Sequence, residues 1–437
     1  MIGRDAAAVE RLYDSMTERE WARMDRHRTE FYVTLRALRE HLPPPPARVL
    51  DCGGGPGRYA VELARWGHDV TLFDLSAVNL ALAREKAAEA DVTLAGFEQG
   101  TALDLSRFAD HSFDAVLLMG PLYHLLAEAE RRRALAEARR VLRPGGPLFA
   151  AFITRYAAHR DAAVGYPTEP VDRPGLYERI EADGVLPPTT SGDPTFTAYF
   201  ARPEEVAPLC WETGFEVATV LGTEGLVSVI EDQAVNGLTG PAWDWWTEAN
   251  WRAALDPSLH GAGEHLLVVA RNPRWRPVLR EIARRLAEAE VRYTVVGGTS
   301  LALHGLPLPV KDIDIETDPD GAYRFAALFA PQAVEPVALR EGHSYRSHFG
   351  QFNFDGVQVE VMGRLERREG DGWVPTEMVN TEMVELAGVP VRTSWLEDEV
   401  LAYVRRGRLD RAALCLPRCN RERLLALLRG AGATHAL

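Results

Sequence analysis

The chain is poor in cysteine and has no long apolar run. Four cysteines in 437 residues are too few for a disulfide framework, so we expect reduced thiols. No stretch approaches the roughly 18 apolar residues that a transmembrane helix needs, and residues 1–6 lack the apolar core of a signal peptide. These absences argue against a disulfide-rich secreted protein and against membrane association, and they predict a cytoplasmic protein.

Positive charge is also scarce, because the formal net charge is −14. Residues 277–437 carry 20 Lys and Arg against 23 Asp and Glu, which leaves −11 on residues 1–276. Nucleic-acid binding rests on many Lys and Arg contacts to phosphates, so the acidic N-terminal part disfavours a nucleic-acid partner. We expect small-molecule substrates, and the composition carries no signal for an oligomeric state.

The chain does contain a glycine-rich loop directly after an apolar strand. The strand ends in Asp51, and Gly53, Gly55 and Gly57 follow at alternate positions. Glycines let the backbone turn tightly and approach a ligand closely. A second apolar run ends in Asp74, whose carboxylate can accept hydrogen bonds from both hydroxyls of a ribose.

Two details of this loop separate it from a dinucleotide site. The glycines follow the pattern Gly-x-Gly-x-Gly, and the strand before them ends in an acid. An acid beside the loop fits a ligand with an ammonium and a sulfonium better than one with a pyrophosphate. The stretch resembles motif I of the class I S-adenosylmethionine-dependent methyltransferases. A different nucleotide-binding fold built on the same strand–helix–strand unit is the alternative.

Later segments extend this resemblance to roughly residues 8–272. They are a strand at 113–120, a helix at 128–142, an Arg-Pro-Gly-Gly turn at 143–146, a strand at 147–153, and closing strands near 214–217 and 264–270. The resemblance implies an α/β fold with a Rossmann-like, seven-stranded sheet. Within it we expect a helical cap at 1–46, a methyltransferase domain at 47–272 and a substrate lid at about 155–205.

The resemblance also implies which residues bind S-adenosylmethionine. They are Asp51, Gly53, Gly55, Gly57, Asp74, Thr101, Ala102 and Met119. Thr101 departs from the family, which often has an acid there to contact the adenine amino group. His124 follows the fourth strand, where methyltransferases place substrate-facing residues, and it is the candidate catalytic base. A purely structural role for the Tyr-His pair is the alternative.

A second group of motifs lies in the last third of the chain. An apolar strand ends in Gly297 and Gly298, and Ser300 follows at the start of a helix, where backbone N–H groups can bind phosphate. Twelve residues later come Asp312 and Asp314, on one face of a strand. Two carboxylates so placed can hold Mg²⁺ between the protein and a triphosphate.

The third acid that such a site needs is Glu360, on a strand rich in valine. Lys311 is a candidate phosphate ligand, and a solvated lysine is the alternative. Together the motifs resemble the polymerase-β-like nucleotidyltransferases over roughly residues 277–415. The resemblance implies a smaller α+β domain at 277–437, after a linker at 272–277, that uses Mg²⁺ and a nucleoside triphosphate.

The sequence thus predicts a bifunctional transferase. One domain would methylate a small molecule, and the other would move a nucleoside monophosphate onto a hydroxyl of a small acceptor. Two alternatives stay open for the C-terminal domain: a catalytically silent binding or regulatory module, and a toxin-like transferase that acts on tRNA or protein. The intact acids Asp312, Asp314 and Glu360 favour the active enzyme over the silent module.

Overall fold

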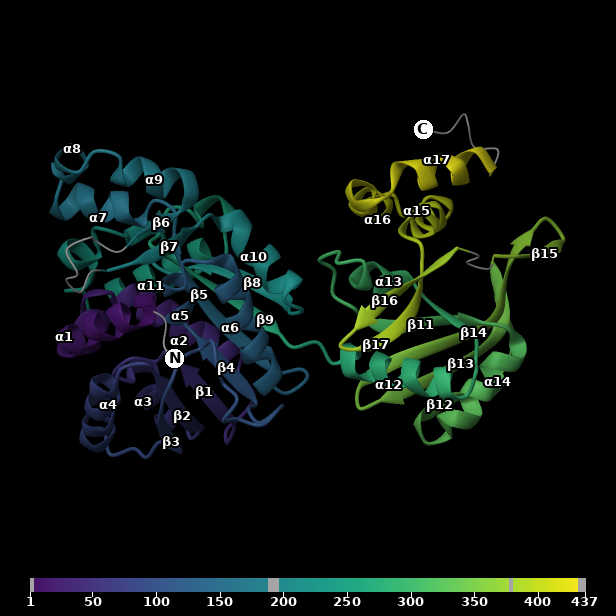
Figure 1. Cartoon of the computed structure of the whole chain (residues 1–437), viewed down its shortest axis with the longest axis horizontal. Helices are drawn as coiled ribbons and strands as arrows, with labels where there is room; N and C mark the ends of the chain where they lie inside the picture. The colour runs from purple at the N-terminus through teal and green to yellow at the C-terminus, as the bar shows by residue number, and fades with distance from the viewer. Residues whose placement is uncertain (1–3, 188–195, 377–379, 431–437) are drawn as a thin grey trace. The chain divides into compact units, whose positions relative to one another are not determined.

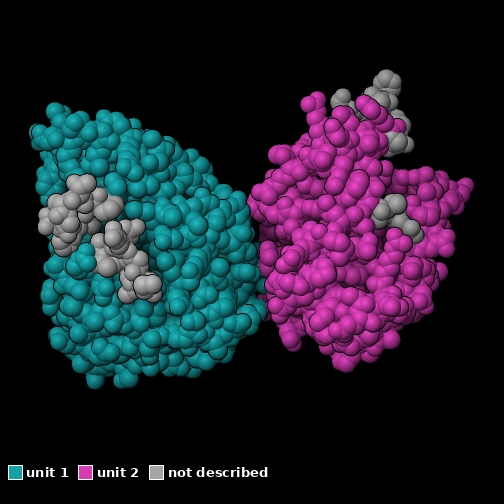
Figure 2. Space-filling model, viewed as in Figure 1, with its two compact units in different colours: residues 1–273 teal, residues 274–437 magenta. Residues whose placement is uncertain are grey.

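Two sheets organise the chain, and each belongs to its own unit. The computed structural model describes residues 4–187, 196–376 and 380–430, and the chain divides into residues 1–273 and 274–437. Figure 1 shows the helices and strands, and Figure 2 colours the two units teal and magenta. None of the described helices combines the length and the apolar character needed to cross a membrane.

The first unit alternates strands with helices, the pattern that builds a largely parallel sheet covered on both faces. Its strands are β1 Arg48–Cys52, β2 Asp69–Asp74, β3 Gly96–Gln99, β4 Ala115–Leu118, β5 Pro147–Thr154, β6 Val185–Leu186, β7 Ala198–Ala201, β8 Glu216–Gly222 and β9 His265–Arg271. Its α-helices are α1 Arg4–Arg26, α2 Arg28–His41, α3 Arg58–Arg65, α4 Ala77–Glu89, α5 Pro121–His124, α6 Glu128–Val141, α7 Ala157–Gly165, α8 Glu169–Asp172, α9 Leu176–Asp183, α10 Pro203–Glu212 and α11 Gly240–Ala254. Three short helical segments are η1 Gly225–Val227, η2 Glu231–Val235 and η3 Pro257–Leu259.

The strand order confirms the predicted Rossmann-like α/β fold. Strands β3-β2-β1-β4-β5 run parallel, and β9 and β8 close the sheet in antiparallel orientation. The described sheet has nine strands rather than seven, because β6 and β7 from the expected lid pair with each other and β7 pairs in parallel with the end of β5. The lid residues 188–195 lie outside the described residues. The carboxyl ends of β1, β2 and β4 meet at one edge, where open α/β sheets bind ligands.

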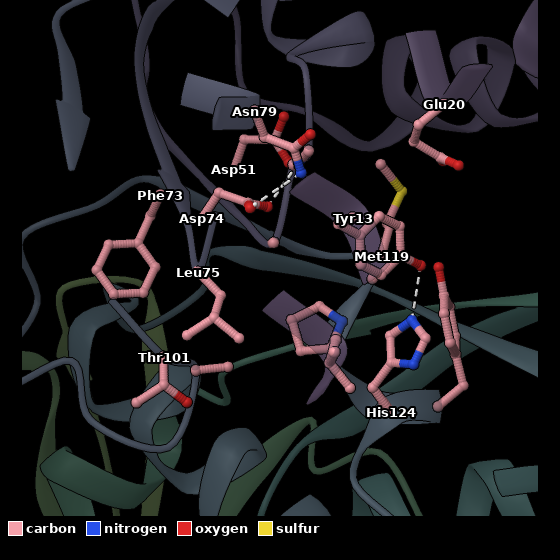
Figure 3. A pocket seen from close by; sticks show the side chains of 18 of the residues that line it. Tyr13, Glu20, Asp51, Phe73, Asp74, Leu75, Asn79, Thr101, Met119 and His124 are labelled. Atoms are coloured by element: carbon pink, nitrogen blue, oxygen red, sulfur yellow. Dashed lines mark hydrogen bonds between the residues drawn. The ribbon is translucent and has the colours of Figure 1, made fainter. Parts of the chain in front are cut away.

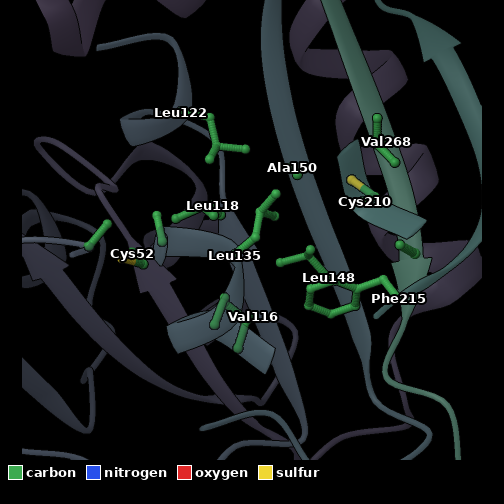
Figure 4. Packing of buried hydrophobic residues seen from close by; sticks show 14 of the residues in the cluster. Cys52, Val116, Leu118, Leu122, Leu135, Leu148, Ala150, Cys210, Phe215 and Val268 are labelled. Atoms are coloured by element: carbon green, nitrogen blue, oxygen red, sulfur yellow. The ribbon is translucent and has the colours of Figure 1, made fainter. Parts of the chain in front are cut away.

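Apolar side chains of the strands and covering helices form the core of this unit. Leu118 of β4, Leu148 of β5 and Leu135 of α6 are fully buried in one cluster (Figure 4). Burial of each such side chain stabilises the fold by about 1.5–3 kcal/mol. The core therefore makes a rigid platform that holds the ends of the strands in place.

The second unit is smaller and mixes strands with helices, as predicted for an α+β domain. Its strands are β10 Tyr293–Val296, β11 Asp312–Thr317, β12 Ala333–Glu341, β13 Tyr345–Phe354, β14 Val357–Glu369, β15 Gly372–Pro375, β16 Thr381–Leu386 and β17 Val389–Ser394. Its helices are α12 Trp275–Glu288, α13 Gly297–Leu303, α14 Pro319–Leu328, α15 Leu396–Arg405, α16 Leu409–Cys415 and α17 Arg421–Gly430, with short segments η4 Ala330–Gln332 and η5 Leu416–Arg418. The sheet has the order β12-β13-β14-β11-β10-β17-β16, and β15 pairs with β14.

One detail of the expected linker differs from the structure. Helix α12 starts at Trp275, inside the stretch expected to be a linker, and Trp275 is 4% exposed. Its side chain packs with Leu279 and Ile282 in the core of the second unit. The second unit therefore begins before residue 277, because an aromatic side chain at the start of the helix is part of its core.

Candidate functional sites

The glycine-rich loop lies at the carboxyl end of β1. Gly53, Gly55 and Gly57 have φ angles of 72°, 57° and 84°, a backbone region that other residues rarely adopt. A Cβ atom at Gly53 would lie 2.5 Å from the ring of Pro121. At Gly53 the loop therefore passes too close to α5 for a side chain to fit.

Asp51 brings a buried carboxylate to this loop. The residue is 1% exposed, and its Oδ2 atom has no hydrogen-bond partner among the described residues. Burial, together with the nearby carboxylate of Asp74, raises the pKa of Asp51 to about 7. Because a buried polar atom without a partner is costly, a cationic group of a ligand at this position would stabilise the site.

Asp74, at the end of β2, is held by three donors. Its Oδ2 atom accepts from the backbone N–H of Gly55 at 2.8 Å. Its Oδ1 atom accepts from the backbone N–H of Ser76 at 2.9 Å and from the side-chain amide of Asn79 at 3.2 Å. Each carboxylate oxygen can accept more than one hydrogen bond, so Asp74 keeps acceptor capacity for the hydroxyls of a ribose.

A cavity at this edge of the sheet, which we name the cofactor cavity, gathers nearly all the predicted cofactor residues. It is lined by Asp51, Gly53, Gly55, Asp74, Thr101, Ala102 and Met119. Gly57 does not line it and instead caps the start of α3. Sequence reasoning missed Glu20, Leu75 and Asn79, which also line the cavity. No motif marks them, although the acid-ended strand before Leu75 pointed to this neighbourhood.

One end of the cofactor cavity holds a Tyr–His pair, opposite the end formed by Thr101 and Leu75 (Figure 3). The Nδ1 atom of His124 lies 2.9 Å from the carbonyl oxygen of Thr197. A carbonyl can only accept, so Nδ1 carries the proton and Nε2 accepts from the Tyr13 hydroxyl at 2.7 Å. Burial lowers the pKa of His124 to about 4, and the imidazole is neutral near pH 7.

A second cavity, which we name the acceptor cavity, adjoins the first. Tyr13, Glu20, Arg23 and Tyr123 line both cavities. Strands β5 and β7 and helices α7, α8 and α9 contribute further walls, and most of these elements come from the region expected to form the lid. A molecule in the acceptor cavity would meet the cofactor cavity at the shared wall.

A buried ionic network borders the acceptor cavity. Arg23 donates to both oxygens of Glu30, at 2.7 and 3.0 Å, and the Nδ1 atom of His265 lies 2.5 Å from Glu224. The ligand atoms of Glu30, Glu224 and His265 lie within 4.8 Å of one another, a spacing that could hold a metal ion. Since Arg23 already engages both oxygens of Glu30, we interpret the cluster as an ion-pair network.

The pKa values of this network follow from its charges. Burial opposes the charged form of each group, but opposite charges outweigh it. Arg23 and then His265 lower the pKa of Glu30 to about 2. Glu30 and Glu224 raise the pKa of His265 to about 9. Both residues are therefore charged at neutral pH.

In the second unit, two predicted acids lie side by side on neighbouring strands. Asp314 of β11 and Glu360 of β14 are register partners in a parallel pair. Gln351 and Gln358 donate to Oε1 of Glu360 at 3.0 and 2.7 Å. Asp312 precedes Asp314 by two residues on the same strand, so both side chains belong to one face.

The carboxylates of this cluster influence one another. Burial, followed by Asp312, Glu360 and Glu399, raises the pKa of Asp314 to about 7. A Cβ atom at Gly297, whose φ is 66°, would lie 2.6 Å from Oδ2 of Asp314, so glycine is needed there. Carboxylates are the ligands that Mg²⁺ prefers, so the donor chemistry of Asp314 and Glu360 suits a divalent metal.

A cavity at this cluster, which we name the nucleotide cavity, is lined by only some of the predicted catalytic and nucleotide-binding residues. Gly297, Asp314 and Glu360 line it. Four predicted residues do not: Gly298, Ser300, Lys311 and Asp312. Residues that the sequence did not single out line it as well, among them Arg340, Tyr345, Glu399 and Arg406.

The structure shows why Ser300 and Lys311 lie outside this cavity and how Glu399 comes to line it. The Ser300 hydroxyl is buried and hydrogen-bonded to the hydroxyls of Thr393 and Ser394, both at 2.9 Å. Lys311 is exposed before the start of β11. Glu399 accepts from the backbone N–H of Gly297 at 2.8 Å, so α15 completes this turn. The acidic first turn of α15 was the only sequence signal for Glu399.

Comparisons with known proteins agree with this division. Residues 49–146 match the family model described as a methyltransferase domain. Residues 278–414 match the model described as aminoglycoside-2''-adenylyltransferase. The two matches fall in different units and include the glycine loop of the first and the acid cluster of the second.

Individual relatives cover one unit at a time. The ubiquinone biosynthesis O-methyltransferase of Xanthomonas axonopodis pv. citri is 36% identical over 134 residues, which is 30% of this chain and 54% of that protein. The O-methyltransferase rstn1 of Aspergillus nomiae is 32% identical over 173 residues, 39% of this chain and 64% of that protein. The chain thus spans about half to two thirds of these curated relatives.

A solved structure is also similar to part of this chain. It is of a Thermotoga maritima protein assigned to the nucleotidyltransferases, which is 36% identical, with 32% of this chain and 88% of that chain covered and a TM-score of 0.30. The two family models lie side by side in one sequence without overlap. The chain therefore joins a methyltransferase domain to a nucleotidyltransferase domain.

Proposed function

We propose that the first unit transfers the methyl group of S-adenosylmethionine to a hydroxyl of a small molecule. One observation carries this proposal: the buried Oδ2 atom of Asp51 has no hydrogen-bond partner among the described residues, in a cavity that Asp74 and the glycine loop also line. S-adenosylmethionine would bring a cationic group to Asp51 and ribose hydroxyls to Asp74. The curated relatives are O-methyltransferases, which supports a hydroxyl as the acceptor.

When bound, S-adenosylmethionine supplies an already activated methyl group. The task of the chain is then to align the acceptor and to remove its proton. The Tyr13 hydroxyl lies at the wall shared by both cavities and donates to Nε2 of His124. As the acceptor oxygen gains a methyl group, its proton can pass to the oxygen of Tyr13 while the Tyr13 proton passes to Nε2.

The low basicity of His124 is compatible with this relay. A methylated, still protonated oxygen is a very strong acid, so even a base with a pKa of about 4 accepts its proton readily. The same low pKa keeps Nε2 unprotonated before the reaction. The methyl ether leaves, and the imidazolium returns its proton to water.

For the second unit we propose transfer of a nucleoside monophosphate from a triphosphate to a hydroxyl of a small acceptor. Asp312, Asp314 and Glu360 would hold a divalent metal, which we take to be Mg²⁺. The metal would neutralise phosphate charge. Arg340 and Arg406, which line the nucleotide cavity, are the candidate phosphate contacts. The four cysteines are unpaired, which suits our further proposal that the protein acts in the reducing cytoplasm.

A screen of hydroxyl-bearing small molecules for release of S-adenosylhomocysteine tests the first activity, with Asp74→Ala as the negative control. A thermal-shift series with ATP, GTP, CTP and UTP, with and without Mg²⁺, tests the second. We expect stabilisation by at least one triphosphate only when Mg²⁺ is present. The double variant Asp312→Asn/Asp314→Asn should lose it, and Asp320→Asn, an exposed acid on α14, should keep it. No stabilisation of the wild type would favour a silent module.

A further inference from the structure

The cations of the acceptor cavity are already neutralised. Each of its arginines, and its protonated histidine, has an acidic partner. These pairs are Arg23 with Glu20 and Glu30, His265 with Glu224, and Arg173 with Glu169. The other histidine in the lining, His27, has a pKa lowered by burial and is neutral near pH 7. The basic residues of the lining therefore leave no positive charge in excess.

Two further acids of the same cavity have no ionic partner. Asp161 of α7 and Glu264, which directly precedes β9, both line it, and neither forms an ion pair within the described part of the chain. Among the described side chains, the Glu264 carboxylate accepts a single long hydrogen bond from Ser228, at 3.5 Å. Burial and then Glu224 raise its pKa, whereas the positive charge of His265 lowers it. The cavity thus carries an excess of negative charge.

The remaining walls of the acceptor cavity are apolar and rich in aromatic rings. Those rings belong to Tyr13, Tyr123, Tyr177, Phe196 and Phe200. Aromatic faces attract cations and pack well against flat apolar groups. An acidic and aromatic lining together select for a ligand that is both cationic and partly apolar.

We propose that the acceptor cavity binds a small molecule that carries a protonated amine and an apolar or aromatic body, with the amine held by Asp161 and Glu264. This inference rests on the proposed methyltransferase function and narrows its acceptor to a cationic class. An anionic acceptor would add a negative charge beside two uncompensated carboxylates, so the cavity discriminates against it.

Three probes that share a phenol and differ in charge test the proposal. They are tyramine, N-acetyltyramine and 4-hydroxyphenylacetate, with charges of about +1, 0 and −1 at pH 7 according to the ordinary pKa values of amines and carboxylates. Calorimetric titration into the full chain saturated with S-adenosylhomocysteine gives their affinities. We expect tyramine to bind at least tenfold more tightly than the neutral probe, and the anionic probe to bind most weakly.

Variants test whether Asp161 and Glu264 cause the preference for the cationic probe. The double variant Asp161→Asn/Glu264→Gln should bind tyramine and N-acetyltyramine with similar affinity. The control Glu178→Gln removes an exposed acid of α9 outside the cavity and should keep the preference. S-adenosylhomocysteine titrated alone should bind all three proteins equally. Equal affinity of the wild type for the three probes, or an unchanged preference in the double variant, would overturn the proposal. If the wild type does not bind S-adenosylhomocysteine, the proposed methyltransferase function is instead overturned.

Discussion

The hydroxyl of Tyr13 lies 2.7 Å from Nε2 of His124, although 111 positions separate the two residues in the chain. Tyr13 belongs to the N-terminal helix α1, and His124 ends the short helix α5 after β4. The contact places a side chain of the helical cap at the wall between the cofactor and acceptor cavities. The cap therefore contributes directly to the proposed reaction.

The protonation state of His124 can be measured directly. Burial lowers its pKa to about 4, and the Thr197 carbonyl fixes the proton on Nδ1. Long-range ¹H–¹⁵N NMR of the full chain should show a neutral Nδ1–H tautomer from pH 8 down to about 5. In Tyr13→Phe the Nε2 signal should shift. Tyr323→Phe removes a similar contact to His348 in the second unit and should leave the His124 signals unchanged. A His124 that titrates near 6.5 would contradict this account.

The ionic network should contribute strongly to the stability of the first unit. Glu30→Gln leaves the partly buried Arg23 and His265 without their shared anion. Loss of one partner from a buried ion pair costs about 3–5 kcal/mol. Chemical denaturation of the first unit within the full chain should show a decrease of that size. Glu18→Gln, an exposed acid of α1, should change the free energy of unfolding by less than about 0.5 kcal/mol.

His265 makes this stability depend on pH. Its pKa is raised from 6.5 to about 9 in the folded chain, so protons bind more tightly to the folded than to the unfolded state between these values. The contribution is therefore complete below about pH 6.5 and is lost as the pH rises through about 9. The difference in unfolding free energy between wild type and His265→Gln should shrink over that window. A difference that stays constant from pH 6 to 10 would contradict the network.

In the acid cluster of the second unit, negative charge should destabilise the fold, whereas the charges of the ionic network stabilise the first unit. The pKa of Asp314 is raised from 3.8 to about 7, so the folded state loses stability as the pH rises from about 4 to 7. Without metal, Asp314→Asn should stabilise the second unit at pH 8 and have little effect at pH 4. With Mg²⁺ the variant should lose the stabilisation by triphosphate. The control Asp320→Asn should have neither effect. If Asp314→Asn destabilised the metal-free protein at pH 8, the predicted repulsion among these carboxylates would be wrong.

Local sequence patterns predicted the parts of both sites that lie on a single strand or turn. Asp51 and Asp74 end apolar runs, and Gly53 and Gly55 need backbone conformations that glycine alone adopts easily, so their placement followed from the chain itself. Glu360 was predicted to lie near Asp314 because such a site needs a third acid and because of the family resemblance. The parallel pairing of β11 with β14 now gives the physical reason.

Contacts between distant elements could not be predicted in this way. The expected helical cap made Tyr13 a possible cofactor contact, but its hydrogen bond to His124 depends on how α1 packs over the sheet. Glu399 reaches Gly297 from α15, about a hundred residues later. Ser300 had the expected spacing, but the hydroxyls of Thr393 and Ser394 at the end of β17 hold its side chain inside the core. Tertiary packing decides these three cases.

The central claim is that the chain has two separate ligand sites, the first of which binds S-adenosylmethionine through Asp74. The most direct test is calorimetric titration of S-adenosylmethionine into wild type, Asp74→Ala and Asp312→Asn/Asp314→Asn, all as full chains. Asp74→Ala removes the acceptor for the ribose hydroxyls, and loss of hydrogen bonds to a charged group, at about 1.5–3 kcal/mol each, should weaken binding at least tenfold. The double variant should match the wild type. Unchanged affinity in Asp74→Ala would contradict the account.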